Sequence, residues 1–384
     1  MGGWFNRMVA NAPMSPMLPR YGNGALTDVM PWVLGAAMAG QSAAPRVPDW
    51  MPDHDVNVRQ RVVLLVDGLG DHQLRQRSAL APTLSAMNGS VITSVAPTTT
   101  ATALTSLSTG MTPGEHGIVG YRMDMGTSIM NSLRWGDERG DLRRAHTPAD
   151  VQPCVPFMGI KVPVISKAEL EDTGFTEAHL RGSLPRGWRV ASSIPVIIRS
   201  LLDAGESVVY AYYDGIDKVA HERGFGSYYD AELRACDRLI ADVIAELPSG
   251  VALYVTADHG QVQVGDNIVH QPDTVMRCVA KQSGEGRFRW LHAKRGAEND
   301  LLAACIDAHS DDAWVVTRQQ MIDEGWFGPV VRPAAQRRLG DVALVARTDV
   351  SFDDPLDGGH FVLQCRHGSM TPAEVEVPLL VHVS

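Results

Sequence analysis

The chain has 384 residues, of which 45% are hydrophobic, a length that allows one large α/β domain or two to three smaller ones. Its formal net charge of -10 argues against nucleic-acid binding through a general basic surface. No run approaches the roughly 20 apolar residues that span a bilayer, and five scattered cysteines, never in CxxC spacing, argue against a disulfide framework or a thiolate zinc site.

Residues 1–58 are rich in Pro, Met, Gly and Ala, which predicts an irregular arm lying on the main body, with one helix over residues 26–38. The arm has no basic segment followed by an apolar core and a cleavage site of small residues, as a signal peptide would have. A cytoplasmic location is therefore expected.

The pattern changes after residue 60. Residues 62–68, VVLLVDG, form an uninterrupted apolar run that ends in Asp-Gly, which is typical of a buried parallel strand. A helix is predicted over residues 71–87. Comparable strands are predicted at residues 90–97, 207–215 and 251–260, with a helix at residues 228–247 between the last two.

Strands that alternate with helices predict a three-layer α/β sandwich, in which helices cover both faces of a mostly parallel central sheet. Residues 121–189 and 261–357 break this alternation and contain many Gly, Pro and charged residues, so we expect two insertions there. The apolar residues 375–383 are expected to return to the sheet. Residues 59–384 would then form one domain.

Acidic side chains follow three of the predicted strands. Asp67 ends the first, Asp217 follows the strand at residues 207–215, and Asp258 and His259 end the strand at residues 251–260. Ligands bind beyond the carboxyl ends of parallel strands, so these side chains should converge at one edge of the sheet. Clustered carboxylates repel one another unless a cation lies among them. Asp and His without Cys suit catalytic zinc, with manganese, iron or magnesium as alternatives.

The spacing of these residues favours two metal sites. Asp217 and His221 are four residues apart, so on a helix both project from one face and can hold the same ion. Asp258 and His259 are adjacent at a strand end, where their side chains diverge and could serve two ions. Asp214 has the poorer register and is expected to be a supporting partner or a turn residue.

A nucleophile is expected where a strand passes into a helix beside the metals. Residues 97–110, PTTTATALTSLSTG, end the second strand and open a helix whose N-terminus favours anionic oxygens. A threonine hydroxyl is a weak nucleophile, and coordination to a divalent cation would activate it. Thr98, Thr99 and Thr100 all qualify by position.

Five motifs occur together in one order: LLVDGLG, PTTTATALTSLSTGMTPGEHGIVGY, DKVAHERG, VTADHG and RHGSMTP. In this combination the chain resembles the nucleotide pyrophosphatase/phosphodiesterase family of the alkaline phosphatase superfamily. The resemblance implies an alkaline-phosphatase-like catalytic domain over residues 59–384. It also implies a hydrolase that cleaves phosphodiester or pyrophosphate bonds in a small-molecule phosphate ester, such as a nucleotide.

The resemblance further implies roles for individual residues. The family places its nucleophile ten residues before the glycine of a Thr-Gly pair, here Gly110, which selects Thr100. Two zinc ions are implied. One would be held by Asp67, Thr100, Asp258 and His259, and the other by Asp217, His221 and His367.

Two alternatives stay open on the same residues: a phosphomonoester or phosphonate hydrolase built on the same core, and a metal-binding homologue without turnover. A sulfatase is not expected, because the Cys/Ser-x-Pro-x-Arg context of its nucleophile is absent. His116 is expected to be a structural turn residue that closes the nucleophile helix. Tyr121, Tyr213 and residues 164–175 are candidates for the wall of the substrate site.

Overall fold

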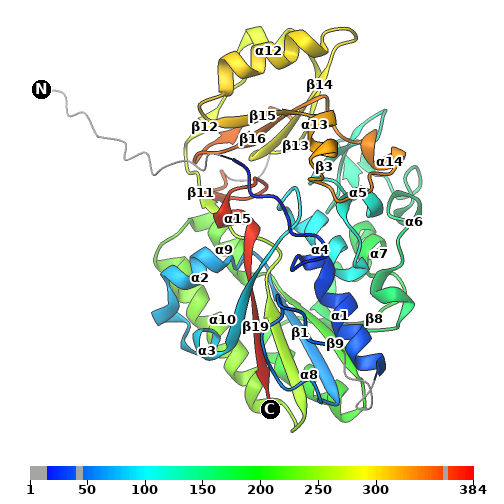
Figure 1. Ribbon diagram of the computed structural model, residues 1–384, viewed down its shortest axis with the longest axis vertical. Helices are drawn as coiled ribbons and strands as arrows, with labels where there is room; N and C mark the ends of the chain where they lie inside the picture. Colours follow the sequence, from blue (N-terminus) through cyan, green and yellow to red (C-terminus); the bar gives the residue numbers. More distant parts are fainter. Residues whose placement is uncertain (1–14, 40–45, 358–361) are drawn as a thin grey trace, which may run out of the picture.

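A seven-stranded sheet forms the centre of the protein. In the computed structural model, which describes residues 15–39, 46–357 and 362–384, helices cover both faces of this sheet (Figure 1). The expected three-layer α/β sandwich is therefore confirmed. In spatial order the strands are β2 (Asn88–Thr93), β19 (Glu376–Val383), β10 (Val251–Thr256), β1 (Gln60–Val66), β9 (Val208–Tyr213), β7 (Pro163–Lys167) and β8 (Leu184–Trp188).

The strands that carry the predicted acids are neighbours in this sheet. β1 lies between β9 and β10 and is parallel to both, so that Val63 is level with Tyr210 on one side and with Tyr254 on the other. β19 runs antiparallel to its neighbours β10 and β2. The carboxyl ends of β1, β9 and β10 therefore meet at one edge of the sheet.

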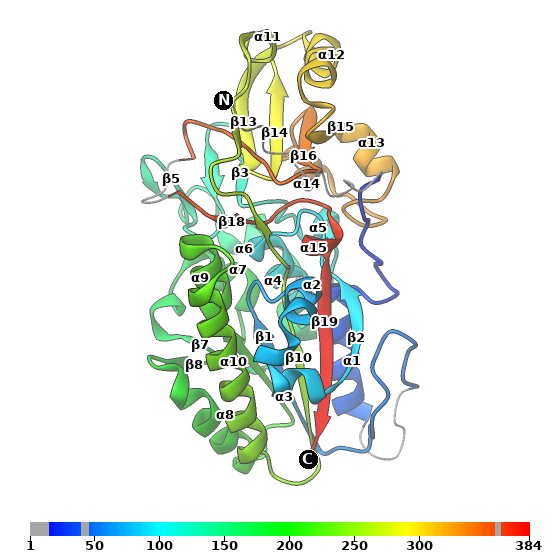
Figure 2. The ribbon, with the colours of Figure 1, turned by 90° about the vertical axis from the view of Figure 1, so that its left-hand side faces the viewer.

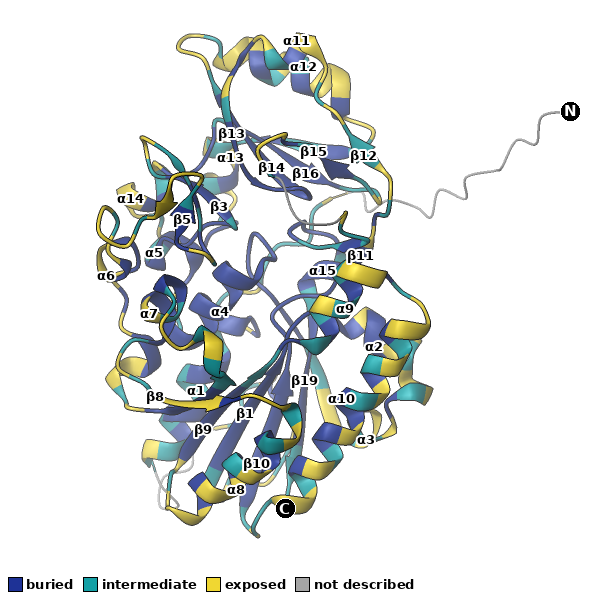
Figure 3. Cartoon of the chain, turned by 180° about the vertical axis from the view of Figure 1, so that it is seen from behind, coloured by how far each residue is buried: buried dark blue, intermediate teal, exposed yellow. Residues whose placement is uncertain are grey.

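The helices form two layers. One face of the sheet is covered by α1 (Leu26–Ala39) and α4 (Thr100–Thr109), which pack on each other. The other face is covered by α8 (Ile194–Asp203) and α10 (Ser227–Glu246), which lie in front of the sheet in Figure 3. Helix α9 (Gly215–Arg223) follows β9 and packs on α10.

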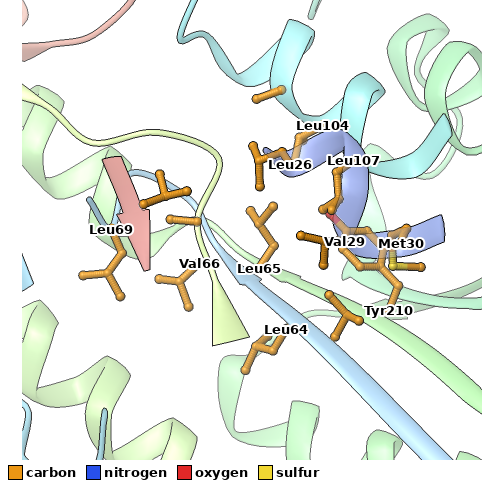
Figure 4. Close-up of a cluster of buried hydrophobic side chains, with 14 of the residues drawn as sticks. Leu26, Val29, Met30, Leu64, Leu65, Val66, Leu69, Leu104, Leu107 and Tyr210 are labelled. Carbon is orange, nitrogen blue, oxygen red and sulfur yellow. The ribbon is translucent and has the colours of Figure 1, made fainter. Parts of the chain in front are cut away.

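Helix α1 belongs to the hydrophobic core, although it lies in the expected arm. Leu26 and Val29 on α1 are fully buried in the same cluster as Leu65 on β1 (Figure 4). Full burial of an aliphatic side chain contributes roughly 1.5–3 kcal/mol, so α1 stabilises the sheet that it covers. Residues 1–14 and 40–45 of the expected arm lie outside the described residues.

Most predicted elements are present. The strands predicted at residues 62–68, 207–215 and 251–260 correspond to β1, β9 and β10, and residues 375–383 return to the sheet as β19. The single helix predicted over residues 71–87 is wrong. Pro82 lacks an amide hydrogen and cannot lie in a helix interior, so this segment divides into α2 (Asp71–Gln76) and α3 (Pro82–Ala86).

The first expected insertion, residues 121–189, lies only partly outside the central sheet. Its strands β7 and β8 form one edge of that sheet, so the expectation is wrong for these two strands. β7 reads PVISK and β8 reads LPRGW. Pro, Gly and charged residues usually indicate a loop, but strands at the edge of a sheet tolerate them. The remainder holds β3 (Arg122–Asp124), β4 (Ile129–Asn131), β5 (Gly136–Asp137), β6 (Gly140–Asp141), α6 (Pro148–Val151) and α7 (Gly174–Leu180).

The second expected insertion, residues 261–357, forms a cap above the carboxyl edge of the central sheet (Figure 2). The cap has its own apolar cluster, which includes Leu291 and Phe352. Its antiparallel sheet has the order β13 (Val279–Glu285), β14 (Phe288–Ala293), β16 (Val342–Ala346) and β15 (Ala313–Thr317). Its other elements are β11 (Val262–Gln263), β12 (Ile268–Val269), α11 (Asp273–Met276), α12 (Glu298–His309), α13 (Arg318–Asp323), α14 (Pro333–Gln336) and β17 (Ser351–Phe352), after which β18 (Cys365–Arg366) and α15 (Pro372–Val375) lead into β19.

All five cysteines are buried and free, as expected for packing residues. None of the helices in the described part of the chain has the length and apolar character needed to cross a bilayer.

The C-terminal end of α4 is fixed by close packing. Gly110 has φ 69°, and a Cβ atom there would lie 2.4 Å from Cγ of Pro31 on α1, so only glycine fits. His116 ends α5 (Pro113–His116) and is fully buried. Its Nε2 lies 2.8 Å from Ser106 Oγ on α4, and its Nδ1 accepts a hydrogen bond from the N–H of Ile118 at 3.1 Å. These contacts support the structural role expected for His116.

Burial lowers the pKa of His116 from 6.5 to about 3, so the folded protein keeps this side chain neutral where the unfolded chain takes up a proton. The unfolding free energy should therefore fall as the pH falls from about 6.5 toward 3, by up to about 1.4 kcal/mol per pH unit from this group. His116→Gln should make this dependence shallower in chemical denaturation at a series of pH values. His72→Gln, on the exposed face of α2, should keep the wild-type slope; a wild-type slope in His116→Gln would contradict the prediction.

Candidate metal centre and active site

The predicted acids lie where three neighbouring strands end. Asp67 follows β1 and Asp258 follows β10, and both are buried; Asp217 on α9 follows β9 and has 14% of its side chain exposed. The Asp217 N–H donates to Asp67 O at 3.1 Å. Asp258 Oδ1 accepts hydrogen bonds from the backbone N–H groups of Gly68 and His259, each at 3.0 Å. The backbone therefore fixes where the Asp258 carboxylate points.

Asp67, Asp258 and His259 form the first group of possible metal ligands, with ligand atoms within 4.8 Å of one another. His259 Nε2 lies 3.6 Å from Asp67 Oδ1 and 3.3 Å from Asp258 Oδ2. Thr100 Oγ1 lies 3.2 Å from the same nitrogen. The four residues expected around one zinc ion are thus together.

Asp217 and His367 form the second group, again with His259. His221 Nε2 lies 3.2 Å from Asp217 Oδ1, and His367 Nε2 lies 3.9 Å from the same oxygen. The rings of His259 and His367 are stacked with their centroids 3.6 Å apart. The structure therefore brings all seven expected residues into one cluster, in which His259 lies between the two groups.

The three histidines are oriented by the backbone. Each has its Nδ1 within hydrogen-bond distance of a carbonyl oxygen, so Nδ1 carries the hydrogen and Nε2 presents its lone pair to the carboxylates. Burial, together with His259 and His221, lowers the pKa of His367 well below its usual range, which keeps the ring neutral as a metal ligand must be. The Nδ1 distances are 2.8 Å from His221 to Cys365 O, 3.1 Å from His259 to Gly260 O, and 2.8 Å from His367 to Thr98 O.

Two carboxylate oxygens of the cluster lack partners. Within the described residues, Asp67 Oδ1 and Asp258 Oδ2 are buried without a hydrogen bond. Burial, and then the charges of Asp258 and Asp217, raises the pKa of Asp67 well above its usual range, and burial also raises the pKa of Asp217. Carboxylates that repel one another and lack donors need a positive charge among them. Together with imidazole nitrogens, they suit divalent cations such as zinc.

Of the three threonines, Thr100 is the one whose hydroxyl lies at the cluster. Thr98 Oγ1 donates to Ser369 O at 2.8 Å and accepts from the Gly368 N–H at 3.0 Å, so it holds the segment before α15. Thr99 is the N-cap of α4, and no side chain caps the first turn. The first N–H groups of α4 are therefore available beside Thr100 for anionic oxygens.

Two residues that the sequence did not single out support the carboxylates. The Tyr212 O–H donates to Asp67 Oδ2, and Gln261 Nε2 donates to Asp217 Oδ1 at 2.8 Å. The register could have revealed Tyr212, because it is level with Leu65, two residues before Asp67, and residues two apart on a strand share a face. Gln261 lies in a loop after β10 and carries no such signal.

Two cavities flank Thr100. The first, of about 240 Å³, is largely apolar and is lined by α4 and by the first insertion, including Phe175 and part of residues 164–175. The second, of about 360 Å³, lies toward the cap, and we call it the cap-side cavity. Tyr121 lines it as expected, whereas Tyr213 lines neither cavity and donates to a carboxylate on α10. The cap-side cavity is lined by Thr100, Tyr121, Arg134, Glu285, Arg366 and His367, among others.

Two further acids lie beside the cluster. Asp214 is bound by Lys167 at 2.8 Å and by Lys218 at 2.7 Å, which fits a supporting acid rather than a metal ligand. Burial raises the pKa of Glu285 to about 8, so its carboxyl group is largely protonated at neutral pH. Neither acid adds an unpaired negative charge to the ligand groups.

Comparison with known proteins identifies the family of this chain. A family model described as type I phosphodiesterase/nucleotide pyrophosphatase matches residues 61–369. Among curated proteins, no sequence matches the chain at a significant level.

Solved structures share the fold at low sequence identity. Human ectonucleotide pyrophosphatase/phosphodiesterase 5 is 15% identical with a TM-score of 0.65, over 84% of this chain and 87% of that one. An inactive variant of the murine protein in complex with AMP is 15% identical, with a TM-score of 0.61 over 84% and 87%. Phosphonoacetate hydrolase from Sinorhizobium meliloti 1021 in complex with phosphonoformate is 16% identical, with a TM-score of 0.63 over 88% and 91%.

If the Tyr212 hydroxyl supports Asp67 as a metal ligand, Tyr212→Phe should weaken zinc binding by about tenfold to a hundredfold, the usual effect of losing such a supporting hydrogen bond. Competition with a chelating dye measures this affinity. Tyr210→Phe is the matched control, because Tyr210 lies two residues earlier on β9 and its hydroxyl makes no hydrogen bond within the described residues. Equal zinc affinity in the two variants would contradict the prediction.

Proposed function

Because the chain belongs to the type I phosphodiesterase/nucleotide pyrophosphatase family and is a phosphoric ester hydrolase, we propose that it cleaves phosphodiester or pyrophosphate bonds in small molecules with Thr100 as the nucleophile. The position of Thr100 carries this proposal. Its Oγ1 lies 3.2 Å from His259 Nε2, at the uncapped start of α4 and beside the first ligand group. Thr100 also lines both cavities, so a substrate in either one can reach its hydroxyl.

We further propose that the centre holds two zinc ions. When bound, they would lower the pKa of the threonine hydroxyl and of the attacking water and neutralise charge on the phosphoryl and leaving oxygens. The position of His259 between the two ligand groups supports two neighbouring sites. One ion would be held by Asp67, Thr100, Asp258 and His259, and the other by Asp217, His221 and His367.

The reaction needs two displacements at phosphorus. In the first, Thr100 Oγ1 releases its proton to solvent and bonds to phosphorus while the bond to the leaving oxygen breaks, so that the threonine carries the phosphoryl group with its remaining substituent. In the second, water attacks the phosphorus and the bond to Oγ1 breaks, which restores the threonine hydroxyl. The free N–H groups in the first turn of α4 would donate to the phosphoryl oxygens as negative charge develops.

A small substrate is supported by the size of the two cavities, about 240 and 360 Å³. Complexes of relatives contain small ligands, AMP in the murine phosphodiesterase and phosphonoformate in the bacterial hydrolase. The largely apolar first cavity suits a flat or aliphatic substituent that remains on the phosphoryl group.

Thr100→Ala should lower the hydrolysis of bis(4-nitrophenyl) phosphate and of the 4-nitrophenyl ester of thymidine 5′-monophosphate by about a thousandfold or more, because the nucleophile is lost. Release of nitrophenolate by the zinc-loaded protein measures this. Thr102→Ala removes the same hydroxyl group from a fully buried position on α4 and is the matched control, which should keep activity.

Turnover of Thr100→Ala at the wild-type rate would rule out this nucleophile. The same assay with 4-nitrophenyl phosphate and a nitrophenyl phosphonate separates the monoester and phosphonate alternatives from the diesterase. A protein that holds two zinc ions but hydrolyses none of these compounds would be the homologue without turnover.

A further inference from the structure

Two arginines line the cap-side cavity without a partner. Within the described residues, neither Arg134 nor Arg366 forms an ion pair or donates a side-chain hydrogen bond, and Arg366 Nε is fully buried. A guanidinium whose Nε is buried without an acceptor is unfavourable unless an anion binds the group.

Two buried arginines of the cap are paired with acids. Arg287 binds Glu374 through Nε and Nη2, each at 2.8 Å, and Arg289 donates to Asp357 at 3.2 Å. Unlike Arg287 and Arg289, Arg366 has no acidic partner among the described residues, and it lines the same cavity as Thr100.

The acids of the cavity do not neutralise these two arginines. Asp357 is held by Arg289. Glu285 forms an ion pair with neither Arg134 nor Arg366, and its Oε1 is buried without a partner among the described residues. Apart from the metal-ligand cluster, the described lining of the cavity therefore includes two guanidinium groups that form no ion pair with its acids.

The cap-side cavity lies where the leaving group is expected. His221 and His367 of the second ligand group line only this cavity, Asp67 of the first group lines only the other, and Asp217 lines both. In an in-line displacement the leaving oxygen departs opposite the attacking oxygen, and in a two-metal centre the two oxygens face different ions. With Thr100 beside the first group, the group that leaves phosphorus enters the cap-side cavity.

We propose that Arg134 and Arg366 bind a negative charge carried by the leaving group. The substrate class is then an ester or anhydride whose leaving group bears its own phosphate or carboxylate, as in the cleavage of a pyrophosphate bond. Arg366 supplies several directed N–H donors from a planar group, and Arg134 adds positive charge at the exposed mouth of the cavity. This inference rests on the proposed function, because Thr100 defines the side from which phosphorus is attacked.

Two substrates with the same thymidylyl group test the site. The 4-nitrophenyl ester of thymidine 5′-monophosphate has a leaving group without an added anion, and thymidine triphosphate releases pyrophosphate. The ratio of kcat/KM for the triphosphate to that for the ester should fall about tenfold in Arg134→Gln and about tenfold to a hundredfold in Arg366→Gln. Arg139→Gln is the control, because Arg139 is exposed, bound to Asp137 and outside the cavity, and should keep the wild-type ratio.

A binding measurement keeps the test independent of turnover. The affinity of the zinc-loaded Thr100→Ala protein for inorganic pyrophosphate can be measured by calorimetry. Adding Arg366→Gln to this variant should weaken pyrophosphate binding about tenfold or more. A third substrate distinguishes a phosphate from a carboxylate on the leaving group. The ester of thymidine 5′-monophosphate with 4-hydroxybenzoate has a leaving group that carries a carboxylate. Loss of its hydrolysis in the arginine variants means that the site binds a carboxylate as well as a phosphate.

An unchanged ratio in both arginine variants, with both thymidylyl substrates hydrolysed, would overturn the inference. If the wild-type protein hydrolyses neither substrate, the proposed function fails, and the pyrophosphate titration still decides whether the arginines bind an anion. Should Arg366→Gln fail to fold by circular dichroism, Arg134→Gln decides the outcome, because Arg134 is exposed.

Discussion

The mutual repulsion of three largely buried carboxylates is the constraint on which the rest of this structure depends. Asp67, Asp217 and Asp258 follow neighbouring strands, and two of their oxygens have no hydrogen-bond partner among the described residues. At low dielectric such charges are compatible only when cations lie among them. The parallel register of β1 with β9 and β10 is what brings the three carboxylates together, so the fold and the need for metal arise from the same strand ends.

The histidines join this edge of the sheet to a segment that is distant in sequence. His367 Nδ1 lies 2.8 Å from Thr98 O, and His221 Nδ1 lies 2.8 Å from Cys365 O, so the residues after the cap connect α9 with the start of α4. In chain order, the last residue of the ligand cluster, His367, follows the cap. Because the cap also carries Glu285 and leads to Arg366, the segments that complete the centre also line the cavity beside it.

The elements closest to the site were the most predictable from sequence. β1, β9 and β10 are apolar runs that end beside Asp or His, and this pattern fixes both the strand and the location of its acid. The residues alone left three threonines open, and the family resemblance was needed to select Thr100 and to include His367. Their gathering in the structure agrees with that choice.

The parts that sequence did not predict depend on contacts made only in the folded chain. β7 and β8 are short and contain Pro and Gly, so the pairing of β7 with β9 and of β8 with β7 is what makes them strands. Gln261 supports Asp217 from a loop that has no periodic pattern. The cavity walls likewise come from insertions whose interiors contain no repeated motif.

Anomalous X-ray scattering from crystals of the zinc-loaded protein, recorded on both sides of the zinc absorption edge, tests the two-cation centre most directly. We expect two peaks, one among Asp67, Asp258 and His259 and the other among Asp217, His221 and His367. A single peak, or peaks remote from these residues, would contradict the centre described above.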